Sequence, residues 1–210
     1  MADRVEDLSH AFERFPGIGP RQAKRFVYYL LSASQFDRTR LAELIQHLGA
    51  DVHQCAECMR FWSGSGTLCN YCADPTRDDS ILMIVEKDQD LVAVERANAY
   101  RGRYFVLGGV LTLSGKGRIR EQELVERVEK RMQRATSGSA AQDGALLEIV
   151  LALSATSEGE HTADRVRELL TPLREHLRIS VLGRGLSTGS ELEYADAQTL
   201  TGALQNRKET

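Results

Sequence analysis

The sequence predicts a mixed α/β protein with a helical N-terminal module, a small cysteine-rich module, a parallel-sheet unit and a C-terminal segment. Apolar residues recur at helical spacing on both sides of a Gly-x-Gly turn near the N-terminus. All four cysteines fall in one short cluster, and strand-like apolar runs then alternate with helical patterns. The boundaries expected from these patterns are 1–54, 55–78, 79–177 and 178–210.

The N-terminal module centres on a turn at residues 15–25, which reads Phe-Pro-Gly-Ile-Gly-Pro-Arg-Gln-Ala-Lys-Arg. Gly17 and Gly19 allow the tight or positive-φ backbone of such a turn, and Pro20 suits the first position of the next helix. Apolar residues flank the turn at helical spacing, at Val5, Leu8, Phe12 and Phe15 and then at Ala23, Val27, Leu30 and Leu31. Two short helices that pack across this turn form a helix-hairpin-helix.

This turn is locally basic. Arg14, Arg21, Lys24 and Arg25 lie in a stretch without an acidic residue. Such cations, with free N–H groups at a helix start, can bind the phosphates of DNA without sequence preference. Arg21 and Arg25 are the first candidates because they lie one helical turn apart; an ordinary hairpin with a solvated basic face is the alternative. The residues predicted to contact DNA are Arg21, Lys24, Arg25, Gly17 and Gly19.

Length and composition set limits on function. A chain of 210 residues can form one sizeable domain with one or two small modules. Its net charge of -3 argues against bulk electrostatic wrapping of DNA, so contacts should come from local patches or from an oligomer that gathers several. No apolar run approaches the roughly 20 residues that span a bilayer, and no signal-peptide pattern follows Met1. We therefore expect a cytoplasmic protein without a membrane partner.

The cysteines form two Cys-x-x-Cys pairs, Cys55 with Cys58 and Cys69 with Cys72, with ten residues between the pairs. Two such pairs complete a tetrahedral thiolate shell around zinc. A cytoplasmic location disfavours disulfides, and redox-active Cys-x-x-Cys motifs normally occur singly, although redox chemistry or accidental spacing is the alternative. Because four thiolates leave no open position for water, we expect the zinc to be structural and to do no chemistry.

The sheet unit follows a polar linker at 74–79. Its strands are predicted at 81–85, 103–107, 146–153 and 179–182, and its helices at 91–99, 121–135 and 162–173, with a flexible loop at 136–144. Strand and helix alternate throughout, which is typical of a parallel sheet with crossover helices.

Three acids follow strands of this predicted sheet. Glu86 comes directly after the first strand, and Glu158 and Glu160 come after the third. Functional groups of parallel sheets gather beyond the carboxyl ends of the strands, where three carboxylates can surround one magnesium ion. Glu158 and Glu160 fit equally well as acids at a helix N-terminus, which the helix dipole favours. Both interpretations stay open.

The chain lacks the motifs of the commonest enzymes. Residues 109–117 resemble a phosphate-binding loop, but five residues separate Gly109 from Gly115 where the motif needs four, and Gly117 replaces the magnesium-binding hydroxyl residue. No Gly-x-Ser-x-Gly motif occurs, and the five histidines are scattered. We therefore do not predict nucleotide hydrolysis.

In their order along the chain, these parts resemble the RecR family of bacterial recombination mediator proteins, over essentially the whole length. The most specific segments are the hairpin at 15–21, the cysteine quartet, 100–109, 158–163 and the tail at 184–196, which reads Arg-Gly-Leu-Ser-Thr-Gly-Ser-Glu-Leu-Glu-Tyr-Ala-Asp. The resemblance implies that residues 79–177 form a Toprim domain, a fold shared with topoisomerases and primases.

The resemblance also implies a function that is not enzymatic. Members of this family act at DNA with RecO, and in many bacteria with RecF, to let RecA replace single-strand-binding protein at gaps and damaged ends. They form ring-like dimers and tetramers, joined through the N-terminal hairpin region and the C-terminal segment. By this resemblance, Arg21 and Arg25 match basic hairpin positions. The Toprim acids Glu86, Glu158 and Glu160 serve mainly as a docking surface for RecO.

A magnesium-dependent nuclease or strand-passage enzyme that uses the same three acids is the alternative function. Toprim enzymes usually carry Asp in the paired positions, and the longer Glu arm would loosen the octahedral shell that magnesium prefers. The sequence also contains no tyrosine or histidine within a motif that would identify it as a catalytic nucleophile. We therefore expect a scaffold with structural zinc, and leave magnesium at the three acids open.

Overall fold

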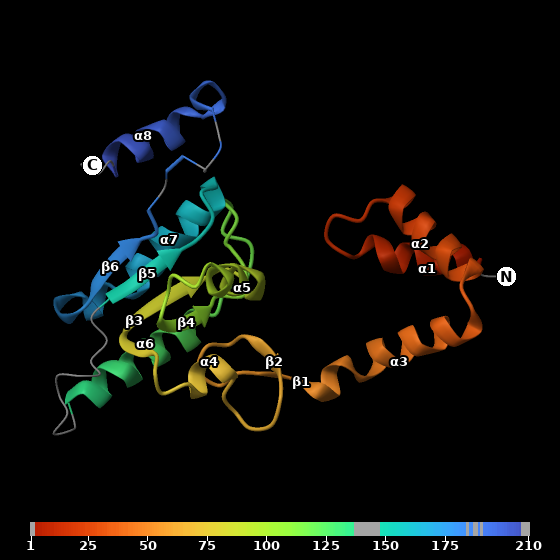
Figure 1. Ribbon diagram of the computed structural model, residues 1–210, viewed down its shortest axis with the longest axis horizontal. Helices are drawn as coiled ribbons and strands as arrows, with labels where there is room; N and C mark the ends of the chain where they lie inside the picture. Colours follow the sequence, from red (N-terminus) through yellow and green to blue (C-terminus); the bar gives the residue numbers. More distant parts are fainter. Residues whose placement is uncertain (1–2, 137–147, 184, 187–188, 190, 207–210) are drawn as a thin grey trace. The chain divides into compact units, whose positions relative to one another are not determined.

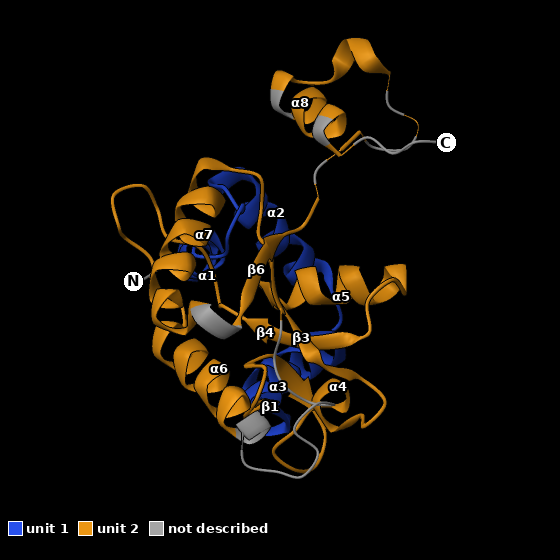
Figure 2. Ribbon diagram, turned by 90° about the vertical axis from the view of Figure 1, so that its left-hand side faces the viewer, with its two compact units in different colours: residues 1–52 blue, residues 53–210 orange. Residues whose placement is uncertain are grey.

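The computed structural model describes residues 3–136, 148–183, 185–186, 189 and 191–206. The chain divides into two compact units, residues 1–52 and residues 53–210 (Figure 2). The loop predicted at 136–144 and the start of the strand predicted from Leu146 lie outside the described residues, apart from Thr136.

The N-terminal unit is helical, as the hairpin pattern predicts. Its first two helices pack against each other, and the rings of Phe12 and Phe26 meet edge to face with 5.7 Å between centroids. The second helix buries Ala23 and Val27. Gly17 sits in the turn at φ 78°, a left-handed conformation that favours glycine. The helices are α1 (Arg4–Glu13), α2 (Pro20–Ser32) and α3 (Gln35–Asp51).

The cysteine-rich module is small and mostly irregular. Two short strands, β1 (Val52–Gln54) and β2 (Phe61–Ser63), form a two-stranded sheet, and a one-turn helix, α4 (Asn70–Ala73), follows. The side chain of Trp62 lies against the backbone of Gly64, where an added Cβ would come within 2.3 Å of the indole ring. The module therefore has few regular elements of its own to hold it together.

The second unit is built on a four-stranded parallel sheet with strand order β4-β3-β5-β6 (Figure 1). Val85 aligns with Val106 on one side and with Ala152 on the other, so the carboxyl ends of these strands meet at one edge. The alternation of strands and helices predicted from the sequence is confirmed. The elements are β3 (Asp78–Val85), α5 (Asp88–Ala97), β4 (Gly102–Val106), α6 (Glu121–Thr136), β5 (Glu148–Ala152), α7 (Ser157–Leu169), the 3₁₀ helix η1 (Thr171–His176) and β6 (Arg178–Val181).

Each face of the sheet has its own core. Leu82 and Ile84 of β3 pack with apolar residues of α6 and α7, whereas the alternate residues Met83 and Val85 pack with Leu91 of α5 and the four cysteines. Alternating side chains of a strand point to opposite faces, so the central strand is buried on both sides. The cysteine-rich module therefore helps to cover the α5 face of the sheet.

The structure moves the start of one predicted helix. The helix predicted at 162–173 begins at Ser157, because Thr156 caps it by accepting the backbone N–H of Gly159 at 3.1 Å. It ends at Leu169, where the 3₁₀ helix η1 begins with Thr171 and a proline. Glu158 and Glu160 consequently lie in the first turn of α7.

The C-terminal segment contains a 3₁₀ turn and a short helix. The turn is η2 (Leu192–Tyr194), and the helix is α8 (Ala197–Gln205), which Asp196 caps by accepting the backbone N–H of Thr199 at 2.9 Å. None of the helices in the described part of the chain combines the length and apolar composition that a membrane span needs.

Candidate functional site

The four cysteines come together in one buried cluster. Cys55 follows β1, Cys58 lies in the next turn, Cys69 caps α4 and Cys72 lies within α4. Their sulfur atoms all lie within 4.8 Å of one another, and the Cys58 and Cys69 sulfurs are 3.6 Å apart. Four thiolates around one zinc ion, at metal–sulfur distances near 2.3 Å, are about 3.8 Å apart. The cluster therefore has the size that a tetrahedral metal site requires.

The backbone of the module shapes this cluster. Met59 takes a left-handed conformation at φ 61° and donates its N–H to the Cys55 carbonyl at 3.0 Å, which closes the first turn. The N–H of Cys72 donates to the Cys69 carbonyl at 3.0 Å in the second turn. The N–H of Cys69 donates to the Cys55 sulfur at 3.4 Å. Such a donor stabilises a thiolate, which is the form that binds metal.

The cysteine-rich module is tied to the sheet at β4. The N–H of Val106 donates to the Cys58 carbonyl at 2.9 Å, and the Arg103 guanidinium donates to the Cys72 carbonyl at 3.1 Å. On the other side, Arg127 of α6 pairs with Glu57 at 2.6 Å, between the first two cysteines. Any ion held by the four sulfurs would therefore brace the edge strand of the sheet as well as the module.

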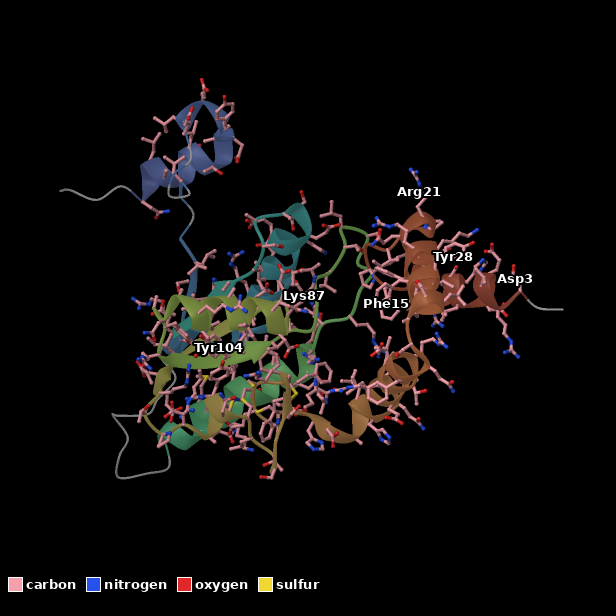
Figure 3. All side chains as sticks on the ribbon, turned by 45° about the vertical axis from the view of Figure 1, so that its right-hand side comes forward. Asp3, Phe15, Arg21, Tyr28, Lys87 and Tyr104 are labelled. Carbon is pink, nitrogen blue, oxygen red and sulfur yellow. The ribbon has the colours of Figure 1, made fainter. Side chains whose placement is uncertain are left out.

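The basic residues of the hairpin differ in their partners. Lys24 pairs with Glu6 of α1 at 2.8 Å, and this hydrogen bond raises the pKa of Lys24. Arg25 donates to the neutral amide of Gln22 at 3.3 Å. Among the residues that the structure describes, neither Arg21 nor Arg25 has a carboxylate within ion-pair distance. Arg21 projects from the start of α2 (Figure 3), so two of the three predicted cations are free for an external anion.

The turn before α2 leaves room for a ligand. Gly19 caps α2 without a side-chain hydrogen bond, and the first turn of this helix contains no acid. A Cβ atom placed on Gly17 or Gly19 would meet nothing within 4 Å. The positive φ angle at position 17 therefore requires glycine there, whereas no neighbouring atom of the chain excludes a side chain. The partly positive end of the helix is therefore open at the surface.

Sequence patterns did not single out Tyr28, which lies on the same helix as the two free arginines. Its exposed fraction is 61 %, and Figure 3 shows it on α2 together with Arg21. The signal was present in the sequence as the spacing of positions 21, 25 and 28, which share one helix face.

The three predicted acids have different environments. Glu86 is 8 % exposed and accepts the backbone N–H of Ser154 at 2.6 Å, so it holds the loop between β5 and α7. Glu158 is exposed and Glu160 is half-buried, both in the first turn of α7. In the part of the chain described, the cysteines are the only group of three or more acidic, cysteine or histidine residues close enough to hold one ion. The three acids do not form such a group.

An open pocket of about 500 Å³ lies beside the start of α7. Glu158 and Glu160 line it, together with Leu113 from the loop after β4 and the residues just before the acids. Glycine is required between the two acids, since a Cβ at Gly159 would lie 2.1 Å from the carbonyl oxygen of Ser154. The arrangement presents two carboxylates and an exposed leucine around one hollow, which suits a basic ligand with an apolar part.

Comparison with known proteins identifies the family. Residues 5–48 match the family model "RecR, helix-hairpin-helix", residues 80–183 match "Toprim domain", and residues 185–208 match "RecR, C-terminal". The chain is 38 % identical over 207 residues to "Recombination protein RecR" of Nocardioides sp. (strain ATCC BAA-499 / JS614), which covers 97 % of this chain and 96 % of the relative.

Proteins of the same name from Frankia alni (strain DSM 45986 / CECT 9034 / ACN14a) and Streptomyces coelicolor (strain ATCC BAA-471 / A3(2) / M145) are 37 % and 36 % identical, with the same coverage. These matches run through the hairpin, the cysteine-rich module, the parallel sheet and the C-terminal segment. The chain belongs to the RecR family of recombination proteins.

Proposed function

We propose that this protein is a DNA-binding recombination mediator in DNA repair, which acts with RecO, and with RecF where it is present, to promote RecA loading at single-stranded gaps. It acts as a scaffold and not as an enzyme. One observation carries the proposal: two arginines of the hairpin lack an acidic partner in the described chain, in a protein whose near-full-length relatives are recombination proteins.

DNA contacts are assigned to the hairpin. Arg21 and Arg25 supply positive charge to the phosphates, while Gly17 and Gly19 let the backbone approach them. Lys24 contributes less than the two arginines because Glu6 already neutralises it. Such contacts give no base sequence preference, which suits a protein that acts at gaps and at junctions of single- and double-stranded DNA wherever they arise.

The metal is assigned as zinc. Four sulfur ligands within 4.8 Å select zinc over magnesium, which prefers oxygen ligands. Three of the cysteines are fully buried and the fourth is 8 % exposed, so substrate has no access to the ion. Zinc therefore has a structural role, as the anchor between the cysteine-rich module and the edge of the sheet.

The acidic start of α7 is assigned as the docking surface for RecO. Glu158 and Glu160 line the pocket with the exposed side chain of Leu113, and a basic protein partner would complement them. Glu86 stabilises this surface because it accepts the backbone N–H of Ser154 and so holds the loop that precedes the two acids. Magnesium binding at these acids, and the nuclease or strand-passage activity that would come with it, is the competing assignment.

Assembly into a dimer or tetramer is assigned to the N-terminal unit and the C-terminal segment. Helix α3 has no buried residue, and its apolar side chains at positions 41, 44, 45 and 48 are each at least 41 % exposed. An apolar helical stripe of this size is typical of a surface that another chain covers. A ring of such copies would gather several hairpins around DNA in the cytoplasm, at the nucleoid.

The experiment that tests the proposal uses labelled gapped duplex DNA with magnesium, in the presence and absence of RecO. Native gels measure retention and denaturing gels measure strand cleavage in the same samples. Retention of intact strands, increased by RecO, is expected. Cleavage that is lost when Glu86 is changed to Gln would establish the Toprim enzyme instead and overturn the proposal.

A further inference from the structure

The exposed face of α2 carries an ordered set of side chains. At 100° per residue, Arg21, Arg25 and Tyr28 fall within an arc of about 60°. The buried residues Ala23 and Val27 lie on the opposite side of the helix, which α1 covers. The stripe of Arg21, Arg25 and Tyr28 therefore points away from the core of the N-terminal unit.

Tyr28 is exposed, and neither its ring nor its hydroxyl is engaged by another side chain through stacking or a hydrogen bond in the described residues. In the described residues, the ring of Tyr28 contacts no other aromatic ring, and its hydroxyl has no hydrogen-bond partner. Its exposed fraction of 61 % leaves much of a flat aromatic side chain open to solvent, within one helical turn of Arg25. Removing an aromatic ring from water is favourable, and folding of this chain leaves the Tyr28 ring largely in water. A ligand that covers the ring therefore gains binding free energy from its burial.

The chemistry of the stripe fits one class of ligand. The guanidinium groups of Arg21 and Arg25 pair with phosphates, and a tyrosine ring stacks on a nucleobase. Tyr28 lies about 10 Å along the helix axis from Arg21, so a strand whose phosphates lie on the arginines can place a base on the ring. Bases inside a duplex are stacked on each other and cannot reach the ring, whereas unpaired bases can.

We propose that Tyr28 is a base-stacking residue that gives the hairpin a preference for single-stranded over double-stranded DNA. This proposal rests on the proposed function of the hairpin as a DNA-binding element. Arg21 and Arg25 supply affinity for any nucleic acid backbone, and Tyr28 adds free energy only where a base is free to stack. The preference does not depend on base identity, because every base has a π-face.

Equilibrium binding of the full chain to three ligands tests the proposal. The ligands are an oligothymidylate, a strand of the same length with the same phosphates but without bases, and a duplex of that length. Tyr28→Ala should weaken binding to oligothymidylate about 5- to 150-fold, as expected from about 1–3 kcal/mol per stacked base. Binding to the abasic strand and to the duplex should change less than about twofold.

Two variants serve as controls. Tyr28→Phe keeps the ring and should retain binding to oligothymidylate. Tyr29→Ala removes a neighbouring ring of 72 % exposure that lies to one side of the stripe, and it should leave all three affinities unchanged. Equal losses on all three ligands for Tyr28→Ala, or a loss for Tyr28→Phe as large as for Tyr28→Ala, would overturn the stacking role.

The failure of the proposed function has a different signature. If Arg21→Ala with Arg25→Ala left all three affinities unchanged, the hairpin would not be the DNA-binding element. If those substitutions weakened binding to every ligand and Tyr28→Ala had no selective effect, only the stacking proposal would fail. Sedimentation velocity completes the test, because a smaller assembly for Tyr28→Ala would assign the ring to an interface between copies and overturn the proposal.

A crosslinking measurement works even where affinity is low. A strand that contains 5-iodouracil, irradiated at high concentrations of protein and strand, forms a zero-length bond with an aromatic ring stacked on the base. Mass spectrometry of the digested product should locate the bond at Tyr28. Bonds formed only at other aromatic residues, or with equal yield from a duplex carrying the same base, would contradict the proposal.

Discussion

Individual side-chain pairings decide which cations of the hairpin can bind a ligand. Lys24 is occupied by Glu6, whereas Arg21 and Arg25 face no carboxylate in the described chain. Changing both arginines to Ala should weaken DNA binding at least tenfold at low salt. The slope of log K against log salt should fall by about 0.7–0.9 for each phosphate that the variant no longer neutralises. Fluorescence anisotropy over a salt series measures both quantities.

The matched control removes two other exposed arginines of the same unit, Arg4→Ala with Arg40→Ala, which changes the net charge equally. The control should reduce affinity much less, because its charges lie on α1 and α3 and outside the stripe. Equal effects of the two double variants would show that only net charge matters, and would contradict a specific role for the hairpin arginines.

Gly159 permits the close approach that places both acids at the start of α7. A Cβ there would lie 2.1 Å from the carbonyl of Ser154, so Gly159→Ala should reduce the free energy of unfolding by about 1–3 kcal/mol. Gly49→Ala is the control, because a Cβ on this residue of α3 meets nothing within 4 Å and should stabilise the helix by about 0.5–1 kcal/mol. Urea denaturation compares the two; a harmless Gly159→Ala would refute the steric argument.

The sequence predicts the cysteine cluster and the free arginines better than the pairings between distant segments. Cys-x-x-Cys spacing and helix periodicity are local patterns, so they can be recognised along the chain. The hydrogen bond from Ser154 to Glu86 joins residues 68 apart, and the ion pair between Arg127 and Glu57 joins residues 70 apart. Such pairs of residues meet only in the folded chain, so no local sequence pattern predicts these contacts.

Among the helices, α7 shows what periodicity detects and what it misses. Ala163, Val166 and Leu170 supply the apolar pattern, so the middle of the helix is predictable. Its first turn is polar and contains a glycine, and its start is set by the hydroxyl of Thr156. The two acids therefore follow β5, as the sequence predicts, and they also lie in the first turn of α7, which periodicity did not reveal.

Charge reversal of this turn tests the docking surface. Glu158→Lys with Glu160→Lys should abolish binding to RecO and leave DNA binding intact or stronger, because the pocket loses its negative charge. Lysines at a helix N-terminus also oppose its dipole, at about 0.3–1 kcal/mol each, so circular dichroism must confirm the fold. Reversal of two exposed acids of α6, Glu123→Lys with Glu129→Lys, is the control. Persistent RecO binding would contradict the docking role.

The packing of α5 on the sheet makes stability depend on pH. Glu95 pairs with Arg77 at 2.6 Å and accepts the Tyr104 hydroxyl at 2.6 Å. Burial alone would raise the pKa of Glu95, but these hydrogen bonds outweigh it and lower that pKa. The pair therefore adds stability fully above the unfolded pKa of about 4.3, and this contribution is lost as the pH falls through the lower folded value.

Glu95→Gln should lower the free energy of unfolding at pH 7 by about 3 kcal/mol, since the buried Arg77 loses its 2.6 Å carboxylate partner and keeps only Asp74, at 3.8 Å, in the described chain. The variant should also lose less stability than the wild type between about pH 5 and pH 3. Denaturation by urea at fixed pH values provides the comparison, and the exposed Glu129→Gln should behave as the wild type. Identical acid dependence in Glu95→Gln and the wild type would rule out this linkage.

At the scale of the whole molecule, an ion held by the four cysteines would join parts that are separate in sequence. Because folding and metal binding are coupled, removal of zinc by a chelator, or Cys58→Ser, should cost on the order of 4 kcal/mol and lower Tm by about 10 °C. Calorimetry with metal analysis measures both. Returning zinc to the chelated wild type should restore Tm, and magnesium should not. A zinc-free protein of unchanged Tm would disprove the structural role.

Strand β4 lies at the edge of the sheet, yet all five of its residues are buried. Three of its backbone groups are occupied from outside the sheet: the Val106 N–H by the Cys58 carbonyl, the Val106 carbonyl by Arg120, and the Gly102 carbonyl by Arg77. An uncovered edge strand invites pairing with a strand of another molecule. If the four cysteines hold zinc as proposed, loss of the ion would uncover part of this edge and favour sheet-to-sheet polymerisation of copies of the chain.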